Sequence, residues 1–325
     1  GAGLRQNLVF SHFKRMLITV PSADEQAAIV RFLDWATGRL DRAIRAKRKV
    51  IGLLNEQKQA IIHRAVTRGL DPEVKLKPSG IPWLGDIPKH WELWRISRFA
   101  RVGNGSTPSR SKTSYWHGGH FPWLNSSQVN RGHIKSADQF VTQLAIRECH
   151  LPQVPAGSVL VAITGQGKTR GMSAVLEIEA TINQHIAFIA PSTQITSPSY
   201  IHLALTAAYL QLRAESDDSG STKGAITCEG LKRFKLPIPP REEQDDLLRF
   251  IQTETRELNS ATSHLEHEID LLREYRTRLV ADVVTGKVDV RDVATRLPDE
   301  APLDAPEDDI DGIGEDEPLH EETDP

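Results

Sequence analysis

The 325-residue sequence predicts an α+β fold, with one globular α+β domain and two long helices that pair as an antiparallel coiled coil. Three observations predict it. Residues 21–71 and 239–289 align with each other without a gap, and both have the apolar spacing of helices. The residues between them contain apolar segments typical of strands and of helices, without regular alternation. A segment rich in proline and glycine, residues 71–89, separates the first helix from this mixed region.

The internal repeat is the longest pattern in the sequence. At an offset of 218 residues, Gln26 meets Gln244 and Phe32 meets Phe250. A repeat of this length indicates one structural unit that is used twice, with something else between the copies.

Each copy carries signals for the start, the seam and the end of a helix. Ser22 and Glu25 form a capping box before the first helix, and Gly69 and Gly286 are placed to end the two helices. Apolar residues recur at alternating steps of four and three, which leaves one narrow seam per helix and indicates a coiled coil. The predicted pairing residues are Leu40, Ile44, Ile51, Leu54 and Ile61 in the first helix, and Leu258, Leu265, Ile269, Leu272 and Leu279 in the second.

The long helix pair has two interpretations. It could be an internal hairpin that only holds the fold together, and the pattern does not exclude this. Residues 40–67 would extend about 42 Å at about 1.5 Å per residue, and a rod of that length between two globular parts acts as a spacer. We favour the spacer.

The order of the chain gives six segments. FKRMLITVP at residues 13–21 parallels LKRFKLPIP at residues 231–239, so the first residues are expected to end a domain that is otherwise absent. The sequence also opens without methionine, which suggests a processed, truncated or fragmentary chain. The segments are 1–20, the remnant of this first domain; 21–70, the first spacer helix region; 71–90, a linker; 91–238, the globular domain; 239–291, the second spacer helix region; and 292–325, an acidic tail expected to be disordered.

The globular domain is expected to mix strands and helices. Residues 158–164 (SVLVAIT) and 187–190 (AFIA) are its best strand candidates, and residues 199–212 (SYIHLALTAAYLQL) are its clearest helix. This mixture without alternation is the reason for choosing the α+β class.

The net charge of −3 conceals a basic body. Residues 297–325 contain 13 acidic residues and no lysine or arginine, so the rest of the chain has 40 basic and 30 acidic residues. A basic body favours an anionic partner, with nucleic acid as the first candidate. Many proteins carry such a charge without this role, so charge alone leaves both interpretations open.

The cysteine count and the hydropathy indicate the cellular compartment of the protein. The two cysteines, Cys149 and Cys228, form no disulfide framework and fit a reducing environment. No apolar run approaches the roughly 18 residues of a membrane span, and no signal peptide opens the sequence. We expect a cytoplasmic protein without a membrane partner.

Three polar segments of the globular domain have the composition of a nucleic-acid surface. They are residues 103–116, residues 123–131, and residues 165–171 followed by 183–185. Their hydroxyl, amide and basic side chains are the types that contact phosphates and base edges. Polar loops are common on any surface, but three of them in one basic domain favour DNA. The candidate DNA contacts are Ser106, Thr107, Arg110, Lys112, Asn125, Ser127, Gln128, Asn130, Gln166, Lys168, Thr169 and Arg170, with Asn183 and Gln184 as lesser candidates.

The third segment also resembles a phosphate-binding P-loop. Gly167, Lys168 and Thr169 follow a predicted strand, as the glycine, lysine and threonine of such a loop do. The residues after Gly171 alternate in hydropathy, which suits a hairpin better than the helix that a P-loop requires. A nucleotide site is therefore the alternative hypothesis. No spacing typical of a metal site or of a catalytic dyad is present.

Several of these stretches together resemble the specificity (S) subunit of type I restriction–modification enzymes. The resemblance rests on the P-x-x-E-E-Q motif at Pro239–Gln244, its partial copy at Pro21–Gln26, and the helix ends AVTRGLD and VVTGKVDV. GDIPKHWE at residues 85–92 is similar to the opening of a target-recognition domain in this family. GNGSTPS…YWHGGHFPWLNSSQV and TGQGKTRG…TINQHIAFIAP resemble one class of such domains.

The resemblance implies a function and a set of partners. Such a subunit has two target-recognition domains, each reading one half of a split double-stranded DNA site, and two helices that set the gap. The helices also dock methyltransferase (M) subunits, which the restriction and motor (R) subunits join. S-adenosylmethionine, ATP and magnesium belong to those partners, so this chain would bind no cofactor and hold no catalytic residue.

The sequence departs from the family pattern in one respect. It has one complete target-recognition domain, residues 91–238, and only the end of another, so it resembles the C-terminal half of an S subunit. Two copies could pair to restore the symmetry, or an upstream domain could supply the other half-site.

Overall fold

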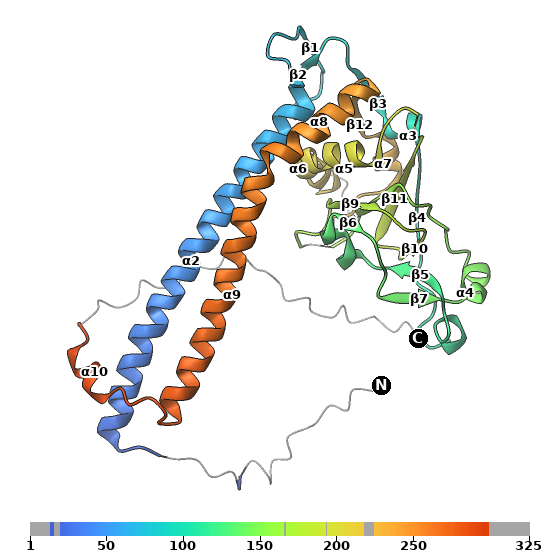
Figure 1. Ribbon diagram of the computed structural model, residues 1–325. Coiled ribbons are helices and arrows are strands. Elements are labelled where there is room, and N and C mark those ends of the chain that lie inside the picture. The colour runs from blue at the N-terminus through green and yellow to red at the C-terminus, as the bar shows by residue number, and fades with distance from the viewer. Residues whose placement is uncertain (1–13, 16–19, 166, 193, 218–223, 299–325) are drawn as a thin grey trace. The chain divides into compact units, whose positions relative to one another are not determined.

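The computed structural model describes residues 14–15, 20–165, 167–192, 194–217 and 224–298. Most of the predicted remnant at residues 1–20 and most of the acidic tail fall outside these residues. The chain divides into two compact units: residues 1–54 with 260–325, and residues 55–259. The described residues mix long helices with short strands (Figure 1), which confirms the α+β class. No helix among the described residues combines the length and apolar character needed to cross a membrane.

The first unit contains most of α2 (Ala23–Arg68) and α9 (Arg256–Val284), together with α10 (Arg291–Arg296). The hydroxyl oxygen of Ser22 accepts a hydrogen bond from the backbone N–H of Glu25 at 3.4 Å, which confirms Ser22 as the N-cap of α2. Gly286 follows α9 with a φ of +75°, a left-handed conformation that glycine adopts at little cost and that ends the helix.

The helices α2 and α9 pair in antiparallel orientation (Figure 1). Asp41 forms an ion pair with Arg276 at 3.1 Å, and Lys47 forms one with Glu268 at 2.5 Å. Residue numbers therefore increase along α2 while those of their partners decrease along α9, as in an antiparallel pair. Ile44 and Ile269 are buried at the seam, and the other eight predicted pairing residues are half-buried. Leu53 and Leu271, each next in sequence to a pairing residue, are 56% and 50% exposed. The buried seam is therefore a single narrow row of residues on each helix, as the alternating spacing of four and three predicts.

The repeat offset reappears in the contacts between these helices. Lys58 donates a hydrogen bond to Asn259 at 2.8 Å, and Arg276 donates one to Asp41 at 3.1 Å. Adding 218 to Lys58 gives Arg276, and adding it to Asp41 gives Asn259. The internal repeat is therefore a repeat of contacts as well as of sequence.

The second unit holds the globular domain, whose strands form four sheets. The largest has the order β4-β11-β8-β9-β6, a three-stranded sheet has the order β10-β5-β7, and β12-β3 and β1-β2 are two-stranded. The strands are β1 (Leu76–Pro78), β2 (Asp86–Pro88), β3 (Glu92–Arg95), β4 (Ala100–Asn104), β5 (Phe121–Leu124), β6 (His133–Ile134), β7 (Gln139–Val141), β8 (Ser158–Ala162), β9 (Ser173–Leu176), β10 (Thr181–Ile182), β11 (Ile186–Pro191) and β12 (Lys235–Ile238). The helices are α3 (Ile96–Phe99), α4 (Gln143–Glu148), α5 (Pro198–Ala207), α6 (Tyr209–Asp217), α7 (Cys228–Arg233) and α8 (Arg241–Glu254), with 3-10 turns η1 (Thr113–Tyr115) and η2 (Ser126–Arg131).

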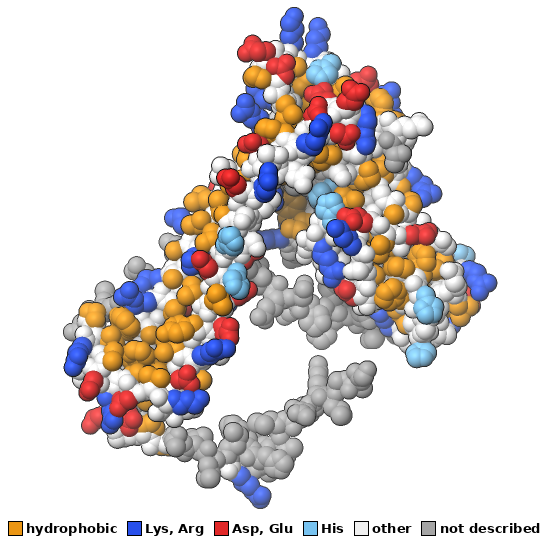
Figure 2. All heavy atoms as spheres, in the orientation of Figure 1, with side chains coloured by type: hydrophobic (Ala, Val, Ile, Leu, Met, Phe, Trp, Pro, Cys, Tyr) orange, Lys and Arg blue, Asp and Glu red, His pale blue; other side chains and the backbone are white. Residues whose placement is uncertain are grey.

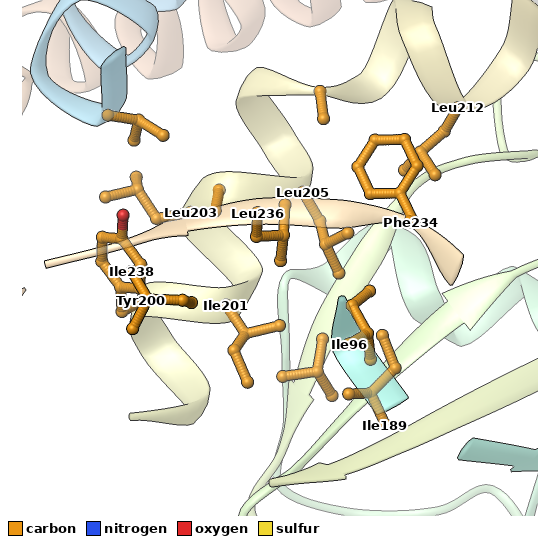
Figure 3. Packing of buried hydrophobic residues seen from close by; sticks show 14 of the residues in the cluster. Ile96, Ile189, Tyr200, Ile201, Leu203, Leu205, Leu212, Phe234, Leu236 and Ile238 are labelled. Atoms are coloured by element: carbon orange, nitrogen blue, oxygen red, sulfur yellow. The ribbon is translucent and has the colours of Figure 1, made fainter. Parts of the chain in front are cut away.

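The core of this unit lies between α5 and the strands it covers. Every residue of β8 is buried, which confirms the strand predicted at residues 158–164, and α5 packs on β8 and β9. Figure 3 shows Tyr200 and Ile201 of α5 beside Ile238 and Leu236 of β12. The helix predicted over residues 199–212 is real but divided, since α5 ends at Ala207 and α6 starts at Tyr209.

Residues 71–90 differ from the predicted linker. They contain β1 and β2, which pair in antiparallel register with Lys77 opposite Ile87. Ile87 is completely buried in the same cluster as Val66 of α2 and Trp91. The abundance of proline and glycine marks the turns of a small hairpin packed on the core, so the segment is part of the fold.

One buried glutamine joins α8 to the loop before α5. The side-chain amide of Gln244 donates to the carbonyl oxygens of Ile195 and Pro239, both at 3.0 Å. Its oxygen accepts from the hydroxyl of Thr196 at 3.0 Å and from the backbone N–H of Ser197 at 3.1 Å. Gln244 has no solvent exposure, and these four bonds satisfy its full hydrogen-bonding capacity.

Candidate nucleic-acid interface

Two of the predicted polar segments meet at one edge of the three-stranded sheet. The strands β5 and β10 are parallel neighbours, with Leu124 opposite Ile182. Asn125 and Asn183 are the next residues of each strand, and the N–H of Asn183 donates to the carbonyl of Leu124 at 3.0 Å. Parallel pairing therefore brings residues 125–127 and 183–185 together at this edge.

The loop after β4 is held against the same edge. A Cβ added to Gly105 would lie 1.8 Å from the carbonyl oxygen of Ile182, so only glycine permits this approach. One residue further, the carbonyl of Ser106 accepts a hydrogen bond from the indole nitrogen of Trp123 at 3.3 Å. Parts of all three polar segments are thus held near the end of β10, namely residues 105–107, 125–127 and 183–185.

Four side chains at this edge form a hydrogen-bonded chain, which we call the amide cluster: Thr107, Gln184, His185 and Thr164. The hydroxyl of Thr107 donates to Oε1 of Gln184 at 2.5 Å. Nε2 of Gln184 lies 3.2 Å from Nε2 of His185, and Nδ1 of His185 lies 2.7 Å from the hydroxyl of Thr164. Burial lowers the pKa of His185 below its usual value, which favours a neutral ring at pH 7.

The basic residues of the first loop differ in their partners. The guanidinium of Arg110 lies 3.8 Å from the ring centre of Trp116 and 4.9 Å from that of Trp123, which orients it on the surface by cation–π contact. Lys112 instead pairs with Glu148 at 2.6 Å, and this carboxylate raises the pKa of the lysine while offsetting its charge. Arg110 also donates a hydrogen bond to Oε1 of Gln139 at 2.9 Å, so it is held on this surface by Trp116, Trp123 and Gln139.

The loop of residues 167–171 is held by α6. The hydroxyl of Tyr209 donates to the carbonyl of Lys168 at 2.7 Å, and Arg213 donates to the carbonyls of Gly167 and Arg170 at 2.7 and 3.0 Å. The loop connects β8 to β9, which pair antiparallel. The chain thus enters a strand after this loop, which confirms the predicted hairpin. The P-loop hypothesis is wrong on this point, because its phosphate cradle needs a helix there.

A sequence model described as the type I restriction modification DNA specificity domain matches residues 88–270, which is more than half of the chain. The chain belongs to this family. The matched range covers the globular domain and continues through α8 into α9.

Curated specificity subunits are also similar to this chain. The specificity subunit of the type I restriction enzyme EcoR124I/EcoR124II from Escherichia coli is 26% identical over 271 residues, which cover 80% of this chain and 61% of that subunit. The MjaIX specificity subunit from Methanocaldococcus jannaschii is 28% identical over 167 residues, which cover 50% of this chain and 38% of that one. The chain therefore spans less than two thirds of the length of either relative.

A solved structure of a type I R–M system contains a chain with the same fold. The TM-score is 0.57 with 17% sequence identity, and the match covers 86% of this chain and 64% of that chain. At this identity the likeness concerns the fold alone.

The fourteen predicted DNA contacts fall into three groups: buried residues, one residue outside the described part of the chain, and exposed or half-buried residues. Gln128, Arg170 and Asn183 are buried, so the structure corrects the expectation that their side chains lie on the surface. Gln128 donates to Asp138 at 2.9 Å, and Asn183 accepts from the N–H of His185 at 3.1 Å, so both support loops from within. Gln166 lies outside the described residues. The others are exposed or half-buried and stay predictions: Ser106, Thr107, Arg110, Lys112, Asn125, Ser127, Asn130, Lys168, Thr169 and Gln184.

His185 and Thr164 are members of the amide cluster that the candidate set did not contain. Thr164 ends one predicted strand segment and His185 lies just before another, each next to a polar turn, and that position is the signal that could have found them. Their contact to each other spans 21 residues of sequence, so no local spacing predicts it.

A half-buried histidine beside β9, His202, is expected to give this domain a pH-dependent stability. His202 of α5 lies 2.8 Å from the hydroxyl of Ser173, and burial, with His133 and Lys58 nearby, lowers its pKa from 6.5 to about 4. Between pH 6.5 and about pH 4, His202 is protonated in the unfolded chain but not in the folded chain. The free energy of unfolding therefore falls as the pH drops through this range. We expect a loss of about 2 kcal/mol between pH 7.5 and pH 5.

Urea denaturation at the two pH values checks this expectation. His202→Gln should remove this part of the pH dependence, whereas His120→Asn, at an exposed histidine, should keep it. An equal fall in wild type and His202→Gln would show that His202 is not the group responsible.

Proposed function

We propose that the chain is a non-catalytic, sequence-specific DNA-binding subunit of a type I restriction–modification complex. It would read one half of a bipartite site with the domain at residues 91–238. Membership of the specificity family supports this, and so does the convergence of residues 105–107, 125–127 and 183–185 at the edge formed by β5 and β10. That convergence is the observation that carries the proposal. A function on DNA would put the chain in the cytoplasm.

The interface supplies both kinds of contact that DNA recognition needs. Arg110 and Lys168 present cationic groups for phosphates, and Thr107, Ser127 and Gln184 present hydroxyl and amide groups for phosphates or bases. Tyr209 and Arg213 hold the Lys168 loop in place, which reduces the entropy that this loop would lose on binding.

The helix pair is the proposed attachment site for methyltransferase subunits, with restriction and motor subunits joining through them. Figure 2 shows hydrophobic side chains gathered over α2 and α9. Four exposed apolar residues of these helices are Val50, Leu53, Leu271 and Tyr275, all between 44% and 56% exposed. Exposed apolar side chains close together are typical of protein interfaces. S-adenosylmethionine, ATP and magnesium would then serve the partners.

A mobility-shift titration of duplex DNA with the full chain tests the proposal, alone and with its methyltransferase subunit. We expect affinity to fall at least about tenfold between 50 and 200 mM salt, since phosphate contacts release counterions. Lys168→Ala should weaken DNA binding and leave ATP binding unaffected. Absence of any shift at low salt, even with the methyltransferase subunit, would overturn the proposal, and loss of ATP binding in Lys168→Ala would restore the nucleotide-site alternative.

A further inference from the structure

Gln184 is held at both ends of its side-chain amide while remaining exposed. Oε1 accepts a hydrogen bond from Thr107 at 2.5 Å, and Nε2 lies 3.2 Å from the ring nitrogen Nε2 of His185. The residue itself is exposed at the edge where the three polar segments converge. A long polar side chain on a surface normally samples several rotamers, so two fixed contacts restrict this one in advance.

The amide orientation and the histidine tautomer fit each other. With Nε2 of Gln184 facing Nε2 of His185, the ring nitrogen must accept, because an amide nitrogen only donates. A neutral His185 then carries its hydrogen on Nδ1, where it can donate to the hydroxyl of Thr164. The hydroxyl of Thr107 faces Oε1 at the other side of the amide.

The amide keeps one further acceptor position and one further donor position. Oε1 has a second lone pair and Nε2 a second hydrogen, so the amide can still accept one hydrogen bond and donate one. In the major groove, adenine presents the complementary pair, the N6 amino donor beside the N7 acceptor, and a glutamine can engage both at once.

The amides that directly follow the two strands, Asn125 and Asn183, lack this combination. Oδ1 of Asn125 accepts from both the N–H and the hydroxyl of Ser127, at 3.1 and 2.6 Å, which uses both of its lone pairs. Asn183 is buried and its Oδ1 bonds with the N–H of His185. Within the first two residues after β5 and after β10 the amides are Asn125, Asn183 and Gln184, and of these three Gln184 alone is both exposed and able to accept and donate.

We propose that Gln184 reads one adenine of the DNA target through a bidentate major-groove contact, with Thr107 and His185 as positioning residues. The inference rests on the proposed function, because it requires that this edge of the domain faces DNA. It adds the identity of one base and the residue that selects it.

Selection from a randomised duplex library, followed by sequencing, tests the inference with the full chain and its methyltransferase subunit. Wild type should select adenine at one position that Gln184→Ala no longer specifies, while the other selected positions stay the same. Binding to the selected duplex should fall by about 5- to 150-fold, and binding to random DNA at low salt should not change. Gln143→Ala, at an exposed glutamine of α4, is the matched control and should keep the wild-type selection.

Variants of the positioning residue separate orientation from contact. Thr107→Val removes the hydroxyl at similar volume and should reduce the preference at that same adenine, whereas Thr107→Ser should retain it. An unchanged preference in Gln184→Ala, a loss at a position where wild type selects another base, or an equal loss of binding to all sequences would each overturn the inference. If wild type itself selects no sequence, the proposed function fails as well, so the two failures are distinguishable.

Discussion

Gln244→Ala is expected to lower the free energy of unfolding of the unit at residues 55–259 by about 4 kcal/mol. The alanine would leave two carbonyl oxygens, one backbone N–H and one hydroxyl without their present partner, in a site with no solvent exposure. Each buried polar group deprived of its bond costs about 1–3 kcal/mol, and relaxation of the hydroxyl and entry of water recover part of the sum. A loss of this size lies at the upper end of single substitutions because a whole network is broken.

The internal repeat supplies a matched control for this experiment. Gln26 is the counterpart of Gln244, and its side-chain amide donates to the carbonyl of Pro21 at 2.8 Å, just as Gln244 donates to Pro239. Gln26 is exposed, however, so Gln26→Ala should cost less than about 1 kcal/mol. Urea denaturation of the two variants measures the difference. Equal small losses would show that the buried network around Gln244 contributes little to stability.

The sequence predicted those parts of the fold that depend on neighbours along the chain. The N-cap at Ser22, the end of α9 at Gly286 and the buried strand β8 each have a local signal, and the structure has them where they were expected. The hairpin within residues 71–90 was missed because proline and glycine mark turns and linkers alike. A packed hairpin differs from a linker because Ile87 is buried in one cluster with Val66 of α2. Val66 lies 21 residues earlier in the chain, so no local pattern predicts this packing.

The candidate interface was predicted in outline but not in its orientation. Composition identified the three polar segments, yet it could not tell that Gln128 and Asn183 turn inward while Gln184 turns outward. That division depends on the parallel pairing of β5 with β10, which joins residues almost sixty positions apart. The contact between Thr107 and Gln184 spans 77 residues, so only the folded chain reveals it.

Gly105→Ala is the second substitution with a large expected effect, about 3 kcal/mol of stability lost from the globular domain. A new Cβ at 1.8 Å from the carbonyl oxygen of Ile182 overlaps backbone, which cannot rotate away as a flexible side chain would. The loop must then move from the end of β10. The bonds of Ser106 with Trp123 and of Thr107 with Gln184 depend on its present position.

Two measurements check this prediction together. Urea denaturation should show the loss of stability, and mobility-shift titration should show at least about tenfold weaker binding to the selected DNA, because base contacts need a held geometry. Gly167→Ala is the control for stability, since a Cβ there meets nothing within 4 Å, and it should change the free energy of unfolding by less than about 0.5 kcal/mol. A Gly105→Ala variant with wild-type stability would mean that the loop can leave β10 at no cost. The edge of the three-stranded sheet would then not be the element that positions the DNA-contacting side chains.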